Sequence, residues 1–303
     1  LLRLAESHPN QLFHPFTNGT LIDEDFVSEM VRVGNIAPAL SLEGLEEETD
    51  NRRGKGVYRK IMRAMDLMRE AGCVFGFSAC YARNNVDVIA SDEFIDTMVD
   101  KGCTFGWFFT YVPVGSEPNL DLMATPEQRA KMYDAVRRFR NTKPIFLVDF
   151  WNDGEFSLGC IAGGRRYLHI NAAGDVEPCA FIHYATDNIN DVSLKEALAS
   201  PLMRAYQKRQ PFNQNMLRPC PLIDNPEKLV EIIEESGARS TQLGEHAVEP
   251  EVLAGKIQEE YTQHWAAKAD ELWKSNPHPF HDRALGFVEK EAAERKQRMA
   301  SKV

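Results

Sequence analysis

The sequence contains no apolar run long enough to cross a bilayer. It also lacks an excess of positive charge, because its 303 residues carry a formal net charge of −10, which argues against nucleic acid as a partner. Its six cysteines are unevenly spaced, unlike the cysteines of a small disulfide-rich secreted domain. We therefore expect a cytoplasmic protein with no membrane span and no nucleic-acid partner.

Two nucleotide-binding patterns are absent as well. No strand is followed by a GxGxxG turn and no Walker loop is present, which weakens dinucleotide-binding and NTPase hypotheses. The sequence also has no initiator methionine. Leu1, Leu2, Leu4 and Ala5 already share one helical face, so we expect a fragment, or a chain whose beginning was lost.

The first half of the chain repeats one β/α pattern. Short, almost continuously apolar segments are predicted as strands at residues 12–16, 36–42, 73–80, 103–111 and 144–151. Helices are predicted between them: one after Asp23, one over 57–71, one over 92–101 and one opening at 125–128, with a charged loop before the second. Strands of this kind should lie parallel and be covered by helices, either as an open doubly wound sheet or as a (β/α) barrel. In both architectures function gathers at the carboxyl ends of the strands.

A polar hairpin is predicted at residues 159–179. Tyr167, His169 and Asn171 alternate with apolar neighbours, which indicates a strand. A turn at 173–175 would fold a second short strand, 176–180, back along the first.

This hairpin would bring Cys179 toward Cys160, while Cys220 follows in a loop between two prolines. Three thiolates held this way suit a soft metal or an iron–sulfur cluster. The alternative is that the cysteines are small buried apolar residues. Because Pro178 and the prolines beside Cys220 place two of the three in rigid, irregular backbone, we favour the ligand hypothesis.

These segments together resemble the radical S-adenosylmethionine (SAM) enzymes. The TNG motif at 17–19 and the SLEG motif at 41–44, followed by Arg52-Arg53-Gly54, are similar to the TNG and S-x-D-G patterns of that family, in the same order. Cys160, Gly174 and Cys179 fit the C-x(9–15)-G-x4-C opening of its SPASM extension. The resemblance implies a partial (β/α) barrel over residues 1–155, a SPASM or twitch-like cluster domain over 156–240 and a helical extension over 241–303.

The resemblance also assigns site residues, although it identifies no catalytic residue. It implies contacts to SAM from six positions: Asn18, Ser41, Glu43, Arg52, Arg53 and Tyr111. It implies that Cys160, Cys179 and Cys220 hold one auxiliary [4Fe–4S] cluster, with His183 and Asp224 as candidates for the fourth iron site. A guanidinium suits the SAM carboxylate because its forked donors match two oxygens, but the sequence does not choose between the two arginines.

The activity implied is reductive cleavage of SAM to a 5′-deoxyadenosyl radical that abstracts hydrogen from an unknown substrate, a peptide or small metabolite. An electron donor such as flavodoxin or ferredoxin is implied too. The family's C-x3-C-x2-C motif and the dense cysteine run of full SPASM domains are absent from these 303 residues. Two alternatives therefore stay open: a non-catalytic or partner-dependent iron–sulfur protein, and a structural zinc-binding module.

Overall fold

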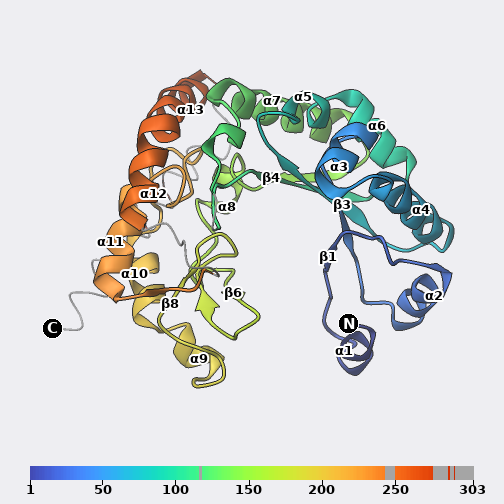
Figure 1. Cartoon of the computed structure of the whole chain (residues 1–303), viewed down its shortest axis with the longest axis horizontal. Coiled ribbons are helices and arrows are strands. Elements are labelled where there is room, and N and C mark those ends of the chain that lie inside the picture. Colours follow the sequence, from blue (N-terminus) through green and yellow to red (C-terminus); the bar gives the residue numbers. More distant parts are fainter. Residues whose placement is uncertain (116–117, 243–249, 276–285, 287–289, 291–303) are drawn as a thin grey trace. The chain divides into compact units, whose positions relative to one another are not determined.

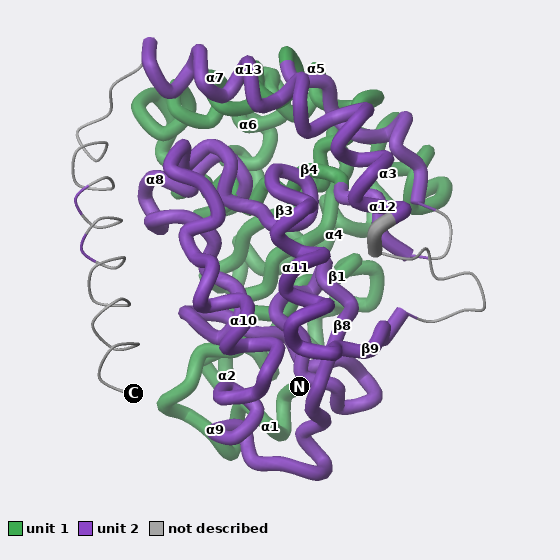
Figure 2. The backbone as a smooth tube through the Cα atoms, turned by 90° about the vertical axis from the view of Figure 1, so that its left-hand side faces the viewer, with its two compact units in different colours: residues 1–111, 127–150 green, residues 112–126, 151–303 purple. Residues whose placement is uncertain are grey.

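The computed structural model describes residues 1–115, 118–242, 250–275, 286 and 290. The chain divides into two compact units, one of residues 1–111 and 127–150 and one of 112–126 and 151–303 (Figure 2). The three-domain boundaries expected from the sequence stay a prediction. Parts of the expected helical extension, at 243–249, 276–285, 287–289 and 291–303, lie outside the described residues.

The first unit contains a five-stranded parallel sheet in the order β1-β2-β3-β4-β5. Its strands are β1 (Phe16–Thr17), β2 (Ala39–Leu42), β3 (Gly76–Tyr81), β4 (Phe105–Thr110) and β5 (Phe146–Asp149). In a doubly wound sheet the strand order reverses at a switch point. The strand order of this sheet never reverses. Because crossovers between parallel strands are right-handed, all connecting helices then lie on one face of the sheet. The α/β class is confirmed, and of the two architectures the structure has the partial barrel.

Seven helices accompany these strands among the described residues: α1 (Leu2–Ser7), α2 (Glu24–Val33), α3 (Glu46–Arg53), α4 (Val57–Glu70), α5 (Val86–Ile89), α6 (Asp92–Asp100) and α7 (Pro126–Thr142). Figure 1 shows α4, α5, α6 and α7 following the outer side of β3 and β4. The side chain of Asp23 caps α2 and that of Ser91 caps α6, each accepting a backbone amide three residues on.

One expectation in this region was wrong. The segment expected to be a charged loop forms α3, which has three glutamates in its first turn and Arg52 and Arg53 in its last. That charge order complements the helix dipole, which is positive at the amino end and negative at the carboxyl end. The helix matters for the site because it brings both arginines back toward the end of β2.

The two faces of the sheet differ in composition. On the helix-covered face, Phe77 packs edge-on against Phe94 and Phe108, with ring centroids 5.3 and 5.5 Å apart, and all three are fully buried. On the opposite face, Trp107 and Phe109 of β4 stack on Phe150 at 5.0 and 4.7 Å. This second face therefore carries an aromatic surface that the connecting helices do not cover.

A glycine allows close packing in the centre of the sheet. A Cβ atom at Gly76 would lie 2.2 Å from the carbonyl oxygen of Phe105 and 2.4 Å from its ring. We expect Gly76→Ala to lower the free energy of unfolding by about 3 kcal/mol, because the backbone must shift to admit the methyl group. Chemical denaturation measures this, and an unchanged value would contradict it. Gly255→Ala, on an open helix surface, is the control and should change stability by no more than about 1 kcal/mol, in the stabilising direction.

The second unit is built around short strands. The hairpin pairs β6 (His169–Ile170) antiparallel to β7 (Val176–Glu177), as the sequence predicted, although both strands are shorter than expected. A second pair joins β8 (Tyr184–Ala185) to β9 (Arg239–Ser240). The helical elements are η1 (Leu120–Leu122), α8 (Gly154–Ser157), α9 (Leu194–Ala197), α10 (Pro201–Arg209), α11 (Pro226–Ser236), α12 (Pro250–Ile257), the π-helical turn η2 (Gln258–Thr262) and α13 (Gln263–Ser275).

The last described helices pack within this unit. Ile257 and Trp265 are completely buried. Thr262 donates its hydroxyl hydrogen to the Ile223 carbonyl at 2.9 Å, and the Trp265 indole donates to the Leu217 carbonyl at 3.1 Å. Both bonds reach the loop that contains Cys220. None of the described helices has the length and apolar character needed to pass through a membrane.

Candidate cofactor and cluster sites

A buried carboxylate marks the carboxyl end of β2. The Glu43 side chain is 1% exposed, and each of its oxygens is bound by a different arginine. Arg52 donates from Nη1 to Oε2 at 2.6 Å, while Arg53 donates from Nε and Nη2 to Oε1 at 2.9 and 2.5 Å. Three of the six residues predicted to contact SAM therefore lie together in the structure. The bonds that it shows are between these three side chains, and their contacts with SAM stay predictions.

Asn85 ties the ends of two strands together beneath this group. Its side-chain amide donates to the carbonyl of Glu43 at 2.9 Å and to that of Cys80 at 3.0 Å, and its oxygen accepts the Ala82 amide at 2.7 Å. Sequence analysis did not select Asn85. Its position in the polar loop after β3 is the signal that could have found it, because strand ends of a parallel sheet share one edge.

Cys80, the penultimate residue of β3, is a second residue that the sequence analysis missed. Burial raises the pKa of its thiol, while a hydrogen bond from Arg52 acts in the opposite direction. Burial in turn lowers the pKa of Arg52, but the charge of Glu43 and the contact with Cys80 outweigh this, so that the net shift is upward. The Arg52 guanidinium is thus shared between a carboxylate and a thiol.

The other three predicted SAM contacts have different surroundings. The hydroxyl of Ser41 lies 3.3 Å from that of Ser78 on the neighbouring strand. Asn18 is exposed, and its oxygen accepts the amide and hydroxyl hydrogens of Thr20, which closes its own turn. The amide of Tyr111 donates to the Tyr81 carbonyl at 2.8 Å and continues the pairing of β3 with β4. Their contacts with SAM stay predictions.

The three cysteines of the second unit lie near one another. Burial, the charge of Asp224 and the charge of Cys160 raise the pKa of Cys220 to about 12. Burial and the charges of Cys160 and Cys220 likewise raise the pKa of Cys179. Tyr206 is also near all three, since burial and the charges of the three cysteines raise the pKa of its phenol. Folding therefore gathers thiols that are far apart in sequence.

The loop around Cys220 is fixed by side chains that bind its backbone. The amide of Cys220 donates to the Asp224 carboxylate at 3.0 Å, and its carbonyl accepts from Asn225 at 3.1 Å. The amide of Leu222 points at the Cys220 sulfur at 3.4 Å. Asp224, a candidate fourth ligand, thus binds the loop backbone, and the other candidate, His183, has Nδ1 3.5 Å from the carboxylate of Glu177.

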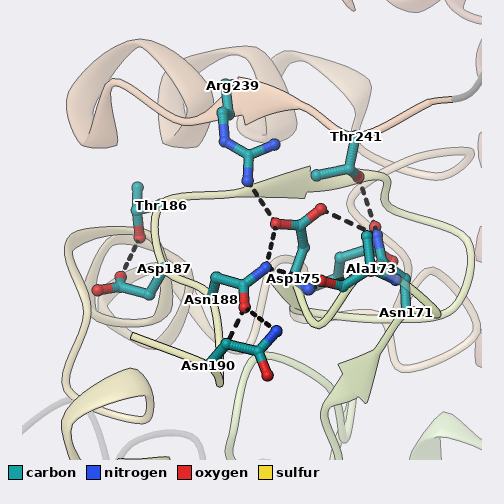
Figure 3. A network of polar contacts seen from close by, with 10 residues as sticks. Asn171, Ala173, Asp175, Thr186, Asp187, Asn188, Asn190, Arg239 and Thr241 are labelled. Atoms are coloured by element: carbon teal, nitrogen blue, oxygen red, sulfur yellow. Dashed lines mark hydrogen bonds and ion pairs between the residues drawn. The ribbon is translucent and has the colours of Figure 1, made fainter. Parts of the chain in front are cut away.

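A network of polar side chains fixes the hairpin that carries Cys179 (Figure 3). The oxygen of Asn171 accepts the amides of Ala173 and Asp175 at 2.9 and 3.0 Å, which closes the turn. Asp175 is then bound by Asn188 at 3.0 Å and by Arg239 in an ion pair. Strand β9, from a distant part of the sequence, therefore braces the hairpin.

We expect Arg239→Ala to destabilise the second unit by about 1 kcal/mol, because the Asp175 carboxylate, 8% exposed, loses a charged donor. Amide hydrogen exchange over 171–177 should also become faster. The control is Arg32→Ala, whose ion pairs with Glu6 and Glu29 are exposed on both sides and should contribute little. Equal losses in the free energy of unfolding for the two variants would contradict the proposed stabilisation of the hairpin by Arg239.

The residues present fit an iron–sulfur cluster. Among the described residues, no three side chains of His, Cys, Asp or Glu lie close enough together to hold one metal ion. A structural zinc site needs all its sulfurs at about 2.3 Å from a single ion, whereas the thiolates of a [4Fe–4S] cluster each bind a different iron and stand further apart. Cys160, Cys179 and Cys220 are close enough to raise one another's pKa, and cysteine thiolates are the usual ligands of an iron–sulfur cluster.

Comparison with protein families gives two matches. Residues 1–95 match the model of the radical SAM superfamily, and residues 160–221 match that of the SPASM iron–sulfur cluster-binding domain. The two matches confirm the resemblance predicted from the sequence motifs, with a radical SAM region first and a SPASM domain after the parallel sheet. These domains imply SAM and [4Fe–4S] clusters as cofactors. The SPASM match starts at Cys160 and also contains Cys179 and Cys220.

Among characterised proteins, the chain is similar to enzymes named AdoMet-dependent heme synthase. It is 22% identical to that of Methanosarcina barkeri over 208 residues, which cover 59% of this chain and 58% of the relative. It is 22% identical to that of Nitratidesulfovibrio vulgaris over 225 residues, which cover 65% and 58%. The chain thus spans less than two thirds of the length of these relatives.

Solved structures share the fold. SuiB of Streptococcus suis superposes with a TM-score of 0.54 at 16% identity, over 65% of this chain and 51% of that one. The enzyme anSMEcpe with bound AdoMet superposes with a TM-score of 0.50 at 16% identity, over 90% and 74%. At such identities the likeness establishes the fold alone.

Proposed function

We propose that this chain works within a radical SAM enzyme that, when intact, cleaves SAM and abstracts a hydrogen atom from its substrate, with an auxiliary [4Fe–4S] cluster in the SPASM domain. The single observation that carries the proposal is the gathering of Cys160, Cys179 and Cys220, inside one SPASM match, by a hairpin and a distant loop. SAM, cleaved by a reduced cluster, supplies the radical that removes the hydrogen atom.

For the SAM site, the geometry favours Arg52 over Arg53 as the contact to the amino-acid carboxylate. Arg53 directs Nε and Nη2 at Glu43 and is 27% exposed, whereas Arg52 is 48% exposed and donates to Glu43 from Nη1. A guanidinium has five N–H donors, so Arg52 retains donors for a ligand. Glu43 would then act as the positioning residue for both arginines, and Ser41, Asn18 and Tyr111 remain further proposed contacts.

The aromatic face of the sheet has a role in this proposal. Trp107, Phe109 and Phe150 form a stacked apolar surface on the face away from the helices. A radical that abstracts hydrogen must be kept from water and side reactions. We propose that these three rings exclude water from the radical. They lie near Ser41 and Ser78, whose hydroxyl groups are neighbours on adjacent strands.

The substrate class proposed is a peptide or small metabolite. SuiB has been solved bound to the precursor peptide SuiA, and anSMEcpe with the Cp18Cys peptide, while the relatives in sequence are named heme synthases. Both classes therefore occur among similar proteins. An electron donor of the flavodoxin or ferredoxin type would complete the system.

Anaerobic iron and sulfide quantitation with EPR on the reconstituted polypeptide tests the proposal. The expected result is one [4Fe–4S] cluster per chain. A polypeptide that binds no iron would overturn the hypothesis of an auxiliary cluster. A polypeptide that binds one zinc ion instead would support the alternative hypothesis of a structural zinc-binding module. For the SAM site, Arg52→Lys should weaken SAM binding by the intact enzyme more than Arg53→Lys does. The reverse order would overturn the assignment of Arg52.

A further inference from the structure

A buried tyrosine lies against one cysteine of the cluster site. The hydroxyl of Tyr206, on α10, is 3.3 Å from the sulfur of Cys160, and the tyrosine is completely buried. A thiolate bound to iron carries no proton, so the phenol must be the donor in this pair. A buried hydroxyl without a partner costs about 1–3 kcal/mol, which favours keeping the bond.

The ring is held in place by its neighbours. Gly163 has a left-handed backbone, with φ at 67°, and a Cβ atom there would lie 2.1 Å from the Tyr206 ring. On another side, Phe212 meets the ring edge-on with centroids 5.0 Å apart. The amide of Gly163 also donates to the carbonyl of Pro178 at 2.9 Å, so the backbone beside the Tyr206 ring is bonded to the residue before Cys179. The hydroxyl is therefore aimed by the fold.

Cys160 also differs from the other two cysteines in its donors. Side chains of Tyr206 and Gln210 act on its sulfur together with the amide of Ala162. Cys179 and Cys220 receive backbone amides. A change at Tyr206 can thus alter the hydrogen bonding of one sulfur without disturbing the backbone donors of the site.

We propose that Tyr206 donates a hydrogen bond to the Cys160 thiolate and thereby makes the reduction potential of the auxiliary cluster less negative. Reduction places extra negative charge on the iron and its sulfurs, and a donor to a ligand sulfur stabilises that charge, so hydrogen bonds tune cluster potentials. This inference rests on the proposed auxiliary cluster. Tyr206 is a positioning and tuning residue in this account, since it binds a ligand of the cluster and no iron.

The test is an anaerobic EPR-monitored titration of the reconstituted chain with dithionite, comparing the wild-type protein with Tyr206→Phe. The variant keeps the ring and removes only the hydroxyl. We expect unchanged iron and sulfide content, a midpoint potential shifted to more negative values, and loss of one exchangeable proton coupling in the deuterium ENDOR spectrum of the reduced cluster. The control, Tyr133→Phe, removes a hydroxyl from a tyrosine buried in the first unit and should leave the potential unchanged.

Each other outcome has a distinct meaning. An unchanged potential in Tyr206→Phe, with the cluster intact, would overturn the tuning role and leave the proposed function standing. Loss of iron from Tyr206→Phe but not from Tyr133→Phe would also overturn it, because Tyr206 would then be a ligand or a structural support. A wild-type protein without a cluster would overturn the proposed function itself.

Discussion

Replacing Cys160, Cys179 or Cys220 by alanine is expected to remove the [4Fe–4S] cluster from the reconstituted protein. The SPASM match contains all three of these proposed ligands, and each would hold a separate iron. Loss of one leaves two protein anchors, too few to retain four irons against exchange with solvent. Iron and sulfide quantitation and the EPR signal after reduction measure the loss.

Two of the three remaining cysteines provide matched controls. Cys73 and Cys103 lie in the first unit, and Cys103 is buried, so Cys73→Ala and Cys103→Ala change the thiol count without touching the cluster domain. Both variants should keep full iron content. If Cys220→Ala kept its cluster, a different residue would have to be the third ligand, and the assignment from the SPASM pattern would be wrong.

Replacing Glu43 by glutamine should destabilise the protein by about 3 kcal/mol, because breaking a buried ion pair leaves uncompensated charge. The Glu43 side chain is 1% exposed and forms an ion pair with both Arg52 and Arg53. Both guanidinium groups retain some contact with solvent, which places the expected loss at the low end for buried pairs. Chemical denaturation gives the change in the free energy of unfolding.

A second ion pair on α3 supplies the comparison. Glu46 pairs with Arg59 on the surface, with side-chain exposures of 49% and 80%, so Glu46→Gln should cost no more than about 1 kcal/mol. Similar losses for Glu43→Gln and Glu46→Gln would show that the Glu43 group contributes little to stability. In that case its role as a positioning residue would also lose its support.

Local sequence patterns predicted the elements that depend on local chemistry. Asp23 and Ser91 were recognisable helix caps, and the alternation around His169 with Gly174 in the turn specified the hairpin. The cysteine ligands could be proposed because their spacing to Gly174 is itself a pattern. The predicted strands were too long, mainly because they began too early: apolar residues precede the ladder hydrogen bonds, whereas β1 and β3 each end one residue later than predicted.

Contacts between distant side chains were not predictable in the same way. Nothing local indicates that Arg52 and Arg53 turn back to Glu43, because that depends on the angle between α3 and β2. Cys80 lies in an apolar strand, where a cysteine normally behaves as a small core residue. Tyr206 occupies a buried position of an ordinary amphipathic helix, and only the fold places it against Cys160.

The bonds from Thr262 and Trp265 to the loop around Cys220 bear on how the cluster domain can be isolated. A fragment cut at the sequence-based boundaries, residues 156–240, would discard both donors and expose the carbonyls of Leu217 and Ile223, which lie on either side of the proposed cluster ligand Cys220 in the sequence. The smallest piece of this protein that holds its auxiliary cluster stably should therefore extend to the end of α13, at Ser275.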